Sequence, residues 1–348
     1  MKIALINDTH FGARGDSQLF FDYFMKFFDE VFFPYLEENN IKTVIHAGDF
    51  MDRRKFVNFS ILNQVRSQFI QKLKENNIEL HCILGNHDVY YRNTNGVNSV
   101  TELFSNDIKI YEIPTIINLG GLDIALLPWV NKENYDNSVE FIKTAPAPIL
   151  IGHLELNGYQ VLRGVKHSGG MNPDILERYE KVLSGHFHCR QEKDNVYYMG
   201  TQYQITFADL EETKGFHILD TETRDIEFIE NPNRMFHKVY YNDEEGPVDT
   251  KEMNFSHLKD SYVRLDVEYK KHPYSFDKFM DTLIDAGVAK ITVIEESSDI
   301  LENEEELVDL AQDTVTLINN EIDLMEEVDN KDKLKKLIKD LYMESLSL

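Results

Sequence analysis

Five short stretches of the chain place aspartate, asparagine or histidine directly after an apolar run. They are INDTH (6–10), HAGDFMD (46–52), LGNHD (84–88), LIGH (150–153) and SGHFH (184–188). Each apolar run has the length and composition of a β-strand, so the polar residues fall where a strand becomes a loop. Ligands collect at the carboxyl ends of strands in parallel α/β sheets. Neighbouring strands would therefore bring these side chains into one cleft.

Each stretch also has an ordinary structural explanation. Asp8 and Asp49 could cap helices or sit in turns, and a single His153 at a strand end is more often structural. His186 and His188 lie two residues apart and face the same side of an extended chain, which packing alone can produce. Together these explanations lose force, because five independent turns have no reason to favour the same three residue types.

The donor types indicate a metal site. Carboxylates, imidazoles and one amide, without cysteine, suit divalent cations such as Mn²⁺, with Mg²⁺, Fe²⁺ or Zn²⁺ as alternatives. Seven donors exceed the needs of one tetrahedral site, so we expect two cations bridged by a shared carboxylate. The candidate ligands are Asp8, His10, Asp49, Asn86, His153, His186 and His188.

Strands and amphipathic helical patterns alternate through the first two-thirds of the chain. Helical patterns at 20–38, 56–76 and 97–104 separate the early strands, which predicts an α/β core with parallel pairing. The later strands follow one another with little helix between them, which favours antiparallel additions. We expect one mixed sheet or two stacked sheets flanked by helices. The apolar stretch 20–36 predicts a helix wedged against the sheet, with a dimer contact as the alternative.

Three domains are expected, at 1–232, 233–298 and 299–348. The second contains a strand, a helix and another strand, and the third contains acidic helices. From residue 295 onward there are 17 acidic and 5 basic residues, in a chain whose net charge is −25. An apolar stripe at helical spacing predicts that the last helix either folds back or docks on a partner. The stripe consists of Leu334, Leu337, Ile338, Leu341 and Tyr342.

Composition limits the classes of function. Hydrophobic residues make up 42% of the chain and charged residues 28%, which is typical of a globular protein. Two cysteines provide no disulfide framework and indicate a reducing compartment. The sequence has neither a signal peptide nor an apolar run of membrane-spanning length, so we expect a cytoplasmic protein without membrane contact. The acidity argues against a broad, sequence-independent grip on a phosphate backbone.

The motifs DxH, GDxxD, GNHD, GH and GHxH, in this order, resemble the calcineurin-like metallophosphoesterase superfamily. Within it the chain is similar to SbcD-type nuclease subunits of double-strand-break repair complexes, and most of all to the recombination endonuclease subunits of tailed phages. The stretch YMGTQYQITF (198–207) adds to the likeness. The resemblance implies a sandwich of two mixed β-sheets flanked by helices, a small α+β capping domain that contacts DNA, and C-terminal helices.

The same resemblance implies a function. The protein would be a metal-dependent DNA exonuclease and single-strand endonuclease acting in DNA repair, recombination or replication, in the host cytoplasm if a phage encodes it. The phosphodiester would be hydrolysed by a hydroxide activated by two metal ions. The C-terminal helices would dock on a P-loop ATPase subunit with coiled-coil arms, since this chain carries no Walker motif of its own. A metallophosphatase or a small-molecule phosphodiesterase on the same fold is the alternative, and a non-catalytic scaffold is disfavoured because every ligand is retained.

Residue roles also follow from the resemblance. One cation would be held by Asp8, His10 and His188, the other by Asn86, His153 and His186, and Asp49 would bridge both. His87 would contact the scissile phosphate or protonate the leaving oxygen. Asp88 would orient the His87 ring, as a carboxylate fixes the tautomer of an imidazole. Asp52 stands where some relatives have histidine, which implies a supporting or phosphate-facing role.

Two surfaces complete the expectations. Basic residues follow the motifs and would position the DNA backbone, although ordinary solvated charge explains each one alone. They are Arg14, Arg53, Arg54, Lys55, Arg92 and Arg190. Relatives form homodimers through helices of the nuclease domain. The helix after GDFMD is the candidate here, through Phe56, Phe59, Leu62, Val65, Phe69 and Leu73.

Overall fold

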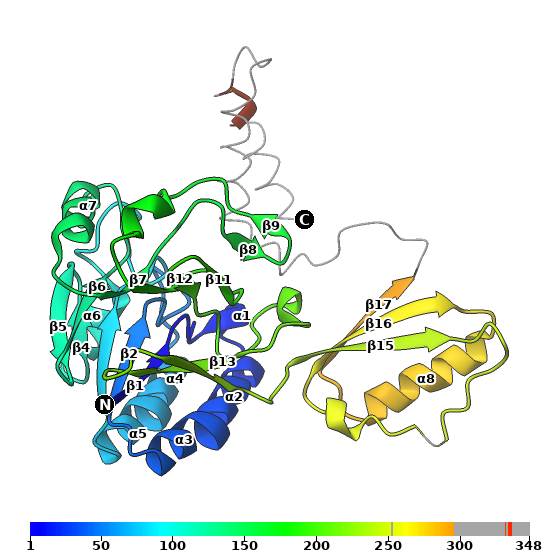
Figure 1. Cartoon of the computed structure of the whole chain (residues 1–348). Helices are drawn as coiled ribbons and strands as arrows, with labels where there is room; N and C mark the ends of the chain where they lie inside the picture. The colour runs from blue at the N-terminus through cyan, green and yellow to red at the C-terminus, as the bar shows by residue number, and fades with distance from the viewer. Residues whose placement is uncertain (252, 296–330, 332, 336–348) are drawn as a thin grey trace. The chain divides into compact units, whose positions relative to one another are not determined.

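The computed structural model describes residues 1–251, 253–295, 331 and 333–335. The chain divides into two compact units, Met1–Ile294 and Glu295–Leu348. The first unit contains two six-stranded sheets, a three-stranded sheet and a small hairpin (Figure 1). The hairpin pairs β8 (Gln160–Leu162) with β9 (Val165–Lys166).

The first six-stranded sheet has the order β14-β13-β1-β2-β3-β4. Its parallel part contains β1 (Lys2–Ile6), β2 (Thr43–Ala47), β3 (Glu79–Ile83) and β4 (Lys109–Tyr111). Two antiparallel strands extend it beyond β1, namely β13 (Gly215–Asp220) and β14 (Ile226–Glu230). Strand β2 is buried at all five positions, as expected for a central strand covered on both faces.

The second sheet has the order β11-β12-β10-β7-β6-β5. Its strands are β5 (Thr115–Leu119), β6 (Leu122–Leu127), β7 (Ile149–His153), β10 (Lys181–Gly185), β11 (Gln191–Lys193) and β12 (Val196–Tyr198). The expectation of antiparallel late strands is only partly right. Strands β11, β13 and β14 are antiparallel additions, but β10 runs parallel to both β7 and β12.

The two sheets pack face to face. Ile45 and Ile83 from the first sheet share a buried core with Ile124, Ile151 and Leu183 from the second. All five side chains are 0% exposed, so the interior between the sheets is dry and apolar. The predicted sandwich of two mixed sheets flanked by helices is confirmed.

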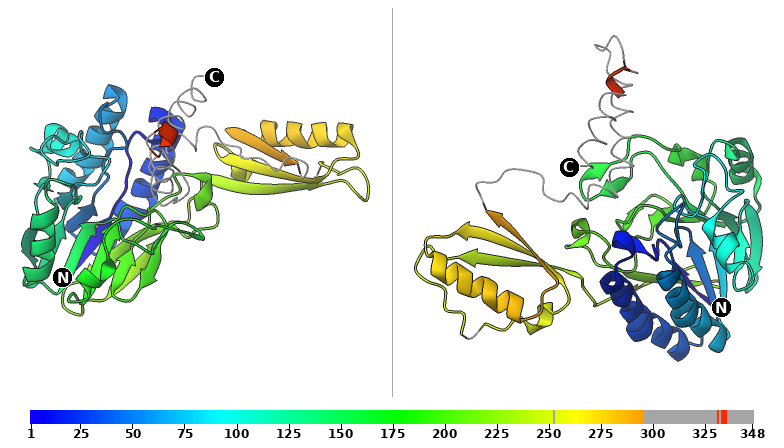
Figure 2. Two further views of the ribbon diagram at one scale, coloured as in Figure 1. Left: turned by 90° about the horizontal axis from the view of Figure 1, so that it is seen from above. Right: turned by 180° about the vertical axis from the view of Figure 1, so that it is seen from behind.

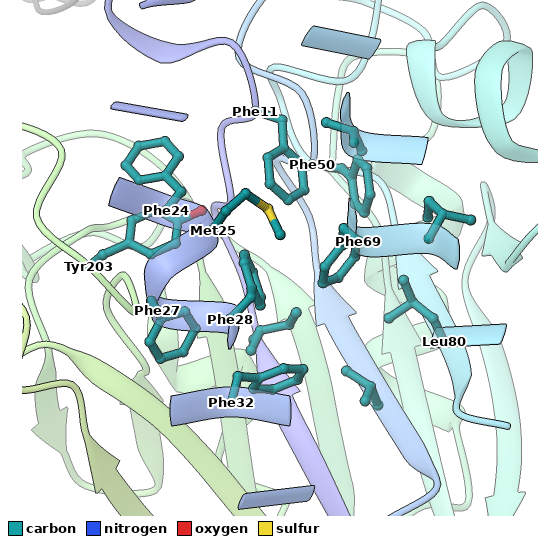
Figure 3. Close-up of a cluster of buried hydrophobic side chains, with 14 of the residues drawn as sticks. Phe11, Phe24, Met25, Phe27, Phe28, Phe32, Phe50, Phe69, Leu80 and Tyr203 are labelled. Carbon is teal, nitrogen blue, oxygen red and sulfur yellow. The ribbon is translucent and has the colours of Figure 1, made fainter. Parts of the chain in front are cut away.

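Two long helical segments cover the outer face of the first sheet (Figures 1 and 2). Each is an α-helix interrupted by a wider π-helical turn. One runs through α2 (Gln18–Phe27), the π turn Phe28–Phe32 and α3 (Phe33–Glu38); the other runs through α4 (Phe59–Gln64), the π turn Val65–Ile70 and α5 (Gln71–Glu75). Phe28 and Phe69 meet with ring centroids 4.7 Å apart, within the cluster of aromatic rings in Figure 3. The predicted wedge helix therefore packs against the sheet.

Shorter helices complete this part of the fold. They are α1 (Ala13–Asp16), α6 (Ser99–Phe104), α7 (Tyr135–Thr144) and 3₁₀ turns at Pro173–Leu176, Phe207–Asp209 and Ser256–Leu258. The helical pattern at 97–104 corresponds to α6. Helix α7 was not expected from the sequence. It contributes Ile142 to the core on the outer side of the second sheet.

The expected dimer face is wrong for four of its six residues. Leu62, Val65, Phe69 and Leu73 are between 0% and 6% exposed and belong to the core beneath the helices. The apolar side of this helix packs toward the sheet, because helical spacing aligns those four residues on one face. Phe56 and Phe59 are 72% and 84% exposed.

The three-stranded sheet has a hydrophobic core of its own. Its elements are β15 (Phe236–Asn242), β16 (Tyr262–Tyr269), α8 (Pro273–Asp285) and β17 (Lys290–Glu295). Leu265 and Leu283 are fully buried between sheet and helix. This matches the strand, helix and strand expected within 233–298.

Little of the C-terminal stripe is described. Leu334 is helical and half-buried, whereas Leu337, Ile338, Leu341 and Tyr342 lie outside the described residues. Among the helices that are described, none is long and apolar enough to cross a bilayer.

Candidate metal centre

The five polar stretches converge where the carboxyl ends of neighbouring strands meet. Strands β1, β2 and β3 are adjacent and parallel in the first sheet, and β7 and β10 are adjacent and parallel in the second. His153 is the last residue of β7, and the other candidate ligands follow the ends of β1, β2, β3 and β10. The stacking of the sheets therefore joins two sets of strand ends into one site.

One group of donors comes from the loops after β1 and β10. The Nε2 atom of His10 lies 3.2 Å from Nε2 of His188 and 3.9 Å from Oδ1 of Asp8. The side chains of Asp8 and His10 are 0% and 4% exposed. The structure thus brings together the three residues expected for the first cation, and their binding of a metal stays a prediction.

A second group comes from the loops after β3 and β10 and from the end of β7. The side-chain amide of Asn86 lies 2.9 Å from both Nε2 of His153 and Nδ1 of His186. Asp49 lies between the two groups, because its Oδ2 is 3.8 Å from Nε2 of His10 and 3.4 Å from Nε2 of His153. A single carboxylate oxygen thus faces both donor sets.

The backbone around the donors adopts a sparsely populated conformation. Asp8, His10, Asp49 and His186 have φ angles of 48°, 41°, 57° and 88°. Such left-handed residues are uncommon outside glycine and cluster at functional sites, where the surrounding structure compels them. Here the amide of Asp8 donates to the carbonyl of Gly48 at 2.8 Å and that of His10 to the carbonyl of Asp49 at 3.1 Å.

Two glycines allow these loops to approach each other. Gly48 has a φ of 91°, and a Cβ there would lie 2.5 Å from Nδ1 of His153. A Cβ on Gly85 would lie 2.1 Å from Oδ1 of Asp49. Glycine is the residue that leaves room at both positions. The GD and GN pairs of the motifs are therefore explained by close packing as well as by donor chemistry.

The arrangement of hydrogen-bonding atoms fits divalent cations. Nδ1 of His153 lies 2.8 Å from the carbonyl of Ala47, which places the proton on Nδ1 and leaves the lone pair of Nε2 facing the centre. That lone pair faces a carboxylate oxygen of Asp49 at 3.4 Å, so a cation between the two atoms would be bound by both. Carboxylate, imidazole and amide donors suit Mn²⁺ or Mg²⁺, and the residues present fit such ions.

The protonation of two histidines reflects the negative potential of the centre. Burial opposes the charged form of His10, but hydrogen bonding to Asp52 and the charges of Asp49 and Asp52 outweigh it and raise its pKa to about 10. Burial likewise opposes protonation of His153, yet Asp49 raises its pKa to about 9. The chain alone therefore draws protons, or other cations, into this site.

The orientation of His87 differs from the expectation. Its Nδ1 donates to the backbone carbonyl of Asp52 at 2.6 Å, and its amide donates to Oδ1 of Asp49 at 2.7 Å. The ring is thus oriented by the Asp52 carbonyl and not by Asp88. Its edge meets the His10 ring with centroids 4.8 Å apart.

The Asp88 side chain binds backbone amides. Its buried carboxylate accepts hydrogen bonds from four backbone amides, those of Asp49, Phe50, Met51 and Gly85, at 2.8–3.2 Å. These amides belong to the loops after β2 and β3, so Asp88 ties the two loops together. The prediction that it orients His87 is wrong because the backbone amides use the oxygens of its carboxylate. The Oδ1 atom of Asp52 lies 3.2 Å from Nδ1 of His10 and supports the His10 ring.

Comparison with known proteins agrees with this geometry. A family model described as calcineurin-like phosphoesterase matches residues 1–190, more than half of the chain and all five motifs. The chain belongs to this family.

Two relatives extend the likeness beyond that domain. Exonuclease subunit 1 of Enterobacteria phage T4 is 33% identical over 349 aligned positions, which cover 99% of each chain. The DNA double-strand break repair protein Mre11 of Methanocaldococcus jannaschii is 27% identical over 229 positions, 58% of this chain and 59% of that protein. The solved structure of an archaeal phosphodiesterase aligns with 66% of this chain and with 100% of its own chain. Its sequence identity is 16% and its TM-score is 0.33, so this likeness is weak.

The basic residues expected near the centre lie on loops or, in the case of Arg14, in α1, and several already have partners in the chain. The Nη1 atom of Arg53 is 3.0 Å from Asp16, and the guanidinium of Arg190 lies over the Phe228 ring at 3.9 Å. Lys55 lies 5.4 Å from the Tyr90 ring, and Arg14 lies 5.5 Å from the Phe20 ring. Arg54 is half-buried and Arg92 is exposed. Their contact with DNA stays a prediction.

Sequence reasoning missed residues that hold the ligands in place. Asn7 donates to Oδ2 of Asp8 and to the carbonyl of Gly200, and Lys214 donates to the carbonyl of His188. Gly200 lies in the stretch YMGTQYQITF, which contributed only to the resemblance. Lys214 lies 26 residues after His188, the end of the last motif, and resembles a surface lysine in the sequence, so no signal marked it.

Proposed function

We propose that this protein is a metal-dependent DNA nuclease, the hydrolytic subunit of a DNA repair or recombination complex. Two cations bound at the Asp8–His188 and Asn86–His153–His186 groups would serve phosphodiester hydrolysis. The observation that carries the proposal is the position of Asp49, whose single carboxylate oxygen faces both donor groups within 3.8 Å. Paired cations suit in-line displacement at phosphorus because they stabilise both the attacking and the leaving oxygen.

DNA is the proposed substrate on the strength of the relatives. A phage exonuclease subunit matches along nearly the whole chain, and a protein named for DNA double-strand break repair matches over 58% of it. Arginines and a lysine on the loops beside the metal centre would contact backbone phosphates. The net charge of −25 predicts that DNA binding by this chain alone is weak and salt-sensitive.

The ligand residues would act by holding charge in a fixed place. Asp8, His10 and His188 would bind one cation and Asn86, His153 and His186 the other, with Asp49 shared. Divalent cations there, Mn²⁺ foremost, would neutralise charge on the phosphate and lower the pKa of the attacking water. The hydrogen bond from His153 to Ala47 and the contact of His10 with Asp52 keep both Nε2 lone pairs directed at the centre.

His87 would act on the substrate itself. Because its Nδ1 donates to the carbonyl of Asp52, Nε2 is the atom left to contact the scissile phosphate or to deliver a proton to the leaving oxygen. Its amide bond to Asp49 ties this ring to the carboxylate shared by both groups. His87 is therefore the proposed general acid.

The chain would work with partners. The acidic residues 299–348 would dock on a P-loop ATPase subunit with coiled-coil arms, since the phage relative is named as a subunit. Two copies would associate near Phe56 and Phe59, the exposed aromatics before and at the start of α4. Residues 233–298 would form a capping domain over DNA. The proposed location is the cytoplasm, that of the bacterial host if a phage encodes the protein.

One comparison of substrates tests the function. The full chain is incubated with Mn²⁺ and with linear duplex DNA, single-stranded DNA circles or a phosphomonoester, with EDTA as the metal-free control. We expect cleavage of both DNA substrates and little hydrolysis of the monoester. Strong monoester hydrolysis without DNA cleavage would instead support a metallophosphatase or small-molecule phosphodiesterase.

A further inference from the structure

Lys214 is a charged side chain in the protein interior. It lies just before β13, and its side chain is 3% exposed. Its Nζ lies 2.6 Å from Oδ1 of Asp209 and 2.7 Å from Oε2 of Glu212. A third contact, at 3.0 Å, reaches the backbone carbonyl of His188. An ammonium group has three donors, and here all three are directed at specific acceptors.

The acceptors that hold Lys214 are themselves anchored. Oδ2 of Asp209 accepts hydrogen bonds from the amides of Ile205 and Thr206, both at 2.9 Å. Asp209 and Thr206 also form the capping box of the 3₁₀ turn Phe207–Asp209. The carboxylate of Asp209 that binds the ammonium is therefore itself held by the backbone of this turn. A buried lysine with two carboxylates is costly to desolvate and is weak evidence for added stability, which raises the question of what it is for.

The third acceptor belongs to a metal-ligand loop. His188 lies beyond the end of β10 at Gly185, outside the strand ladder. Its carbonyl accepts from the amide of Thr201 at 3.2 Å and from Lys214 at 3.0 Å. A Cβ on Gly200 would lie 2.9 Å from the same carbonyl, so the two loops are in close contact. Lys214 thus supplies a charge-assisted bond to the backbone that carries the His188 ring.

We propose that Lys214 is a positioning residue for one of the two metal sites. By holding the His188 backbone it keeps Nε2 of that ring 3.2 Å from Nε2 of His10 and sets the geometry of the Asp8, His10 and His188 group. The second group does not include His188 and has no contact with Lys214 among the described residues. The proposal rests on the metal centre of the proposed function, and DNA as the substrate plays no part in it.

Manganese binding by the full chain tests this role. In Lys214→Met the side chain keeps its length but loses its donors. Calorimetry should show one of the two Mn²⁺ sites weakened tenfold or more and the other unchanged. In electron paramagnetic resonance, the coupled signal of a manganese pair should give way to the six-line signal of a single ion. A purely structural role predicts a lower melting temperature with both sites intact.

The matched control is Lys181→Met. Lys181 is a half-buried lysine that, like Lys214, donates to a backbone carbonyl, here that of Arg224. Because Arg224 has no part in the metal centre, this variant should bind both Mn²⁺ ions as the wild type does. Equal weakening of one site in both variants would overturn the proposal.

A second variant covers the case in which Lys214→Met does not fold. Glu212→Gln removes one charged anchor of Lys214 but keeps the lysine, and it should weaken the same single site by a smaller factor. Wild-type affinity at both sites in Lys214→Met, or in Glu212→Gln if the first variant is insoluble, would overturn the proposal. Failure of the wild type to bind two Mn²⁺ ions would overturn it as well. Two bound ions without DNA cleavage would overturn only the DNA nuclease function.

Discussion

Asp49 shows how much one residue contributes to this centre. Its Oδ2 faces His10 and His153, its Oδ1 accepts from the amide of His87, and its own amide is held by Asp88. Burial alone would raise its pKa, yet the surrounding histidines, His153 first, lower it well below the ordinary value. The carboxylate therefore stays charged, as the proposed role of a shared metal ligand requires.

His87 can be separated from the metal ligands by mutation. His87→Ala should reduce Mn²⁺-dependent DNA cleavage roughly 10²- to 10⁴-fold, the usual contribution of a general acid. Both Mn²⁺ ions should still bind, which calorimetry checks. His257→Ala, an exposed histidine in the small sheet domain, is the control and should be fully active. Unchanged cleavage by His87→Ala at saturating Mn²⁺ would contradict the assignment.

At the scale of elements, the centre depends on how closely the strand ends approach. The loops after β2 and β3 are joined by the four amide bonds to Asp88, and those after β1 and β10 by the amide of His186, which donates to Asp8 at 3.0 Å. Such bonds fix donors in place before any ion arrives, which favours tight and specific binding.

Gly48 tests this close approach. Gly48→Ala should abolish Mn²⁺ binding and destabilise the fold by about 2 kcal/mol or more, since it combines a strained φ with a clash against His153. The control is Gly158→Ala, at a φ of 83° with nothing described within 4 Å of the added carbon. Gly158→Ala should lower the free energy of unfolding only by the backbone strain, about 1 kcal/mol, and leave metal binding intact. Urea unfolding and calorimetry measure both; retained Mn²⁺ affinity in Gly48→Ala would contradict this account.

Strand β13 carries a histidine that should make stability depend on pH. His217 pairs with Leu5 of β1, and burial, followed by the charge of Arg190, lowers its pKa to about 4. The unfolded chain takes up this proton near pH 6.5, before the folded chain does. Stability should therefore fall as the pH drops from 6.5 to 4, by about 2 kcal/mol at pH 5 from this group.

His217→Gln removes that dependence. Urea unfolding at pH 7.5 and pH 5 should show a smaller loss for His217→Gln than for the wild type, with the other histidines common to both. Equal losses in the two proteins would mean that His217 takes up its proton as readily in the folded chain as in the unfolded chain.

On the scale of the whole molecule, the exposed aromatics Phe56 and Phe59 are the proposed contact between two copies. Phe59→Asp should convert a dimer into a monomer in size-exclusion chromatography with light scattering, because a charge cannot be buried in an apolar contact without a large desolvation penalty. Tyr274→Asp is the control, since that side chain is 74% exposed on α8 of the small domain. A Phe59→Asp protein that stays dimeric would place the interface elsewhere.

The acidic C-terminal part should be separable from catalysis. Truncation after residue 298 removes the proposed docking helices and leaves every candidate metal ligand, so basal Mn²⁺-dependent cleavage should survive while binding to the ATPase subunit is lost. The cleavage assay and circular dichroism check the first expectation, and co-purification checks the second. Loss of folding and of basal cleavage would show that the division at 298 is wrong.

The sequence by itself identified the candidate donors, and the resemblance carried by its motifs predicted the sandwich. Donors such as Asp8, Asn86 and His153 follow apolar strand runs in local motifs, so strand ends and ligand types could be recognised together. The helical spacing of the apolar stretch 20–36 likewise predicted a helix packed against a sheet.

Only the tertiary structure decided which partners those residues have. The His87 ring is oriented by the Asp52 carbonyl, Phe69 faces the core while Phe59 faces solvent, and Lys214 reaches His188. Each contact joins segments far apart along the chain or depends on which helix face the sheet covers. Residue spacing reports local periodicity alone, whereas burial and hydrogen-bond partners depend on how the two sheets stack.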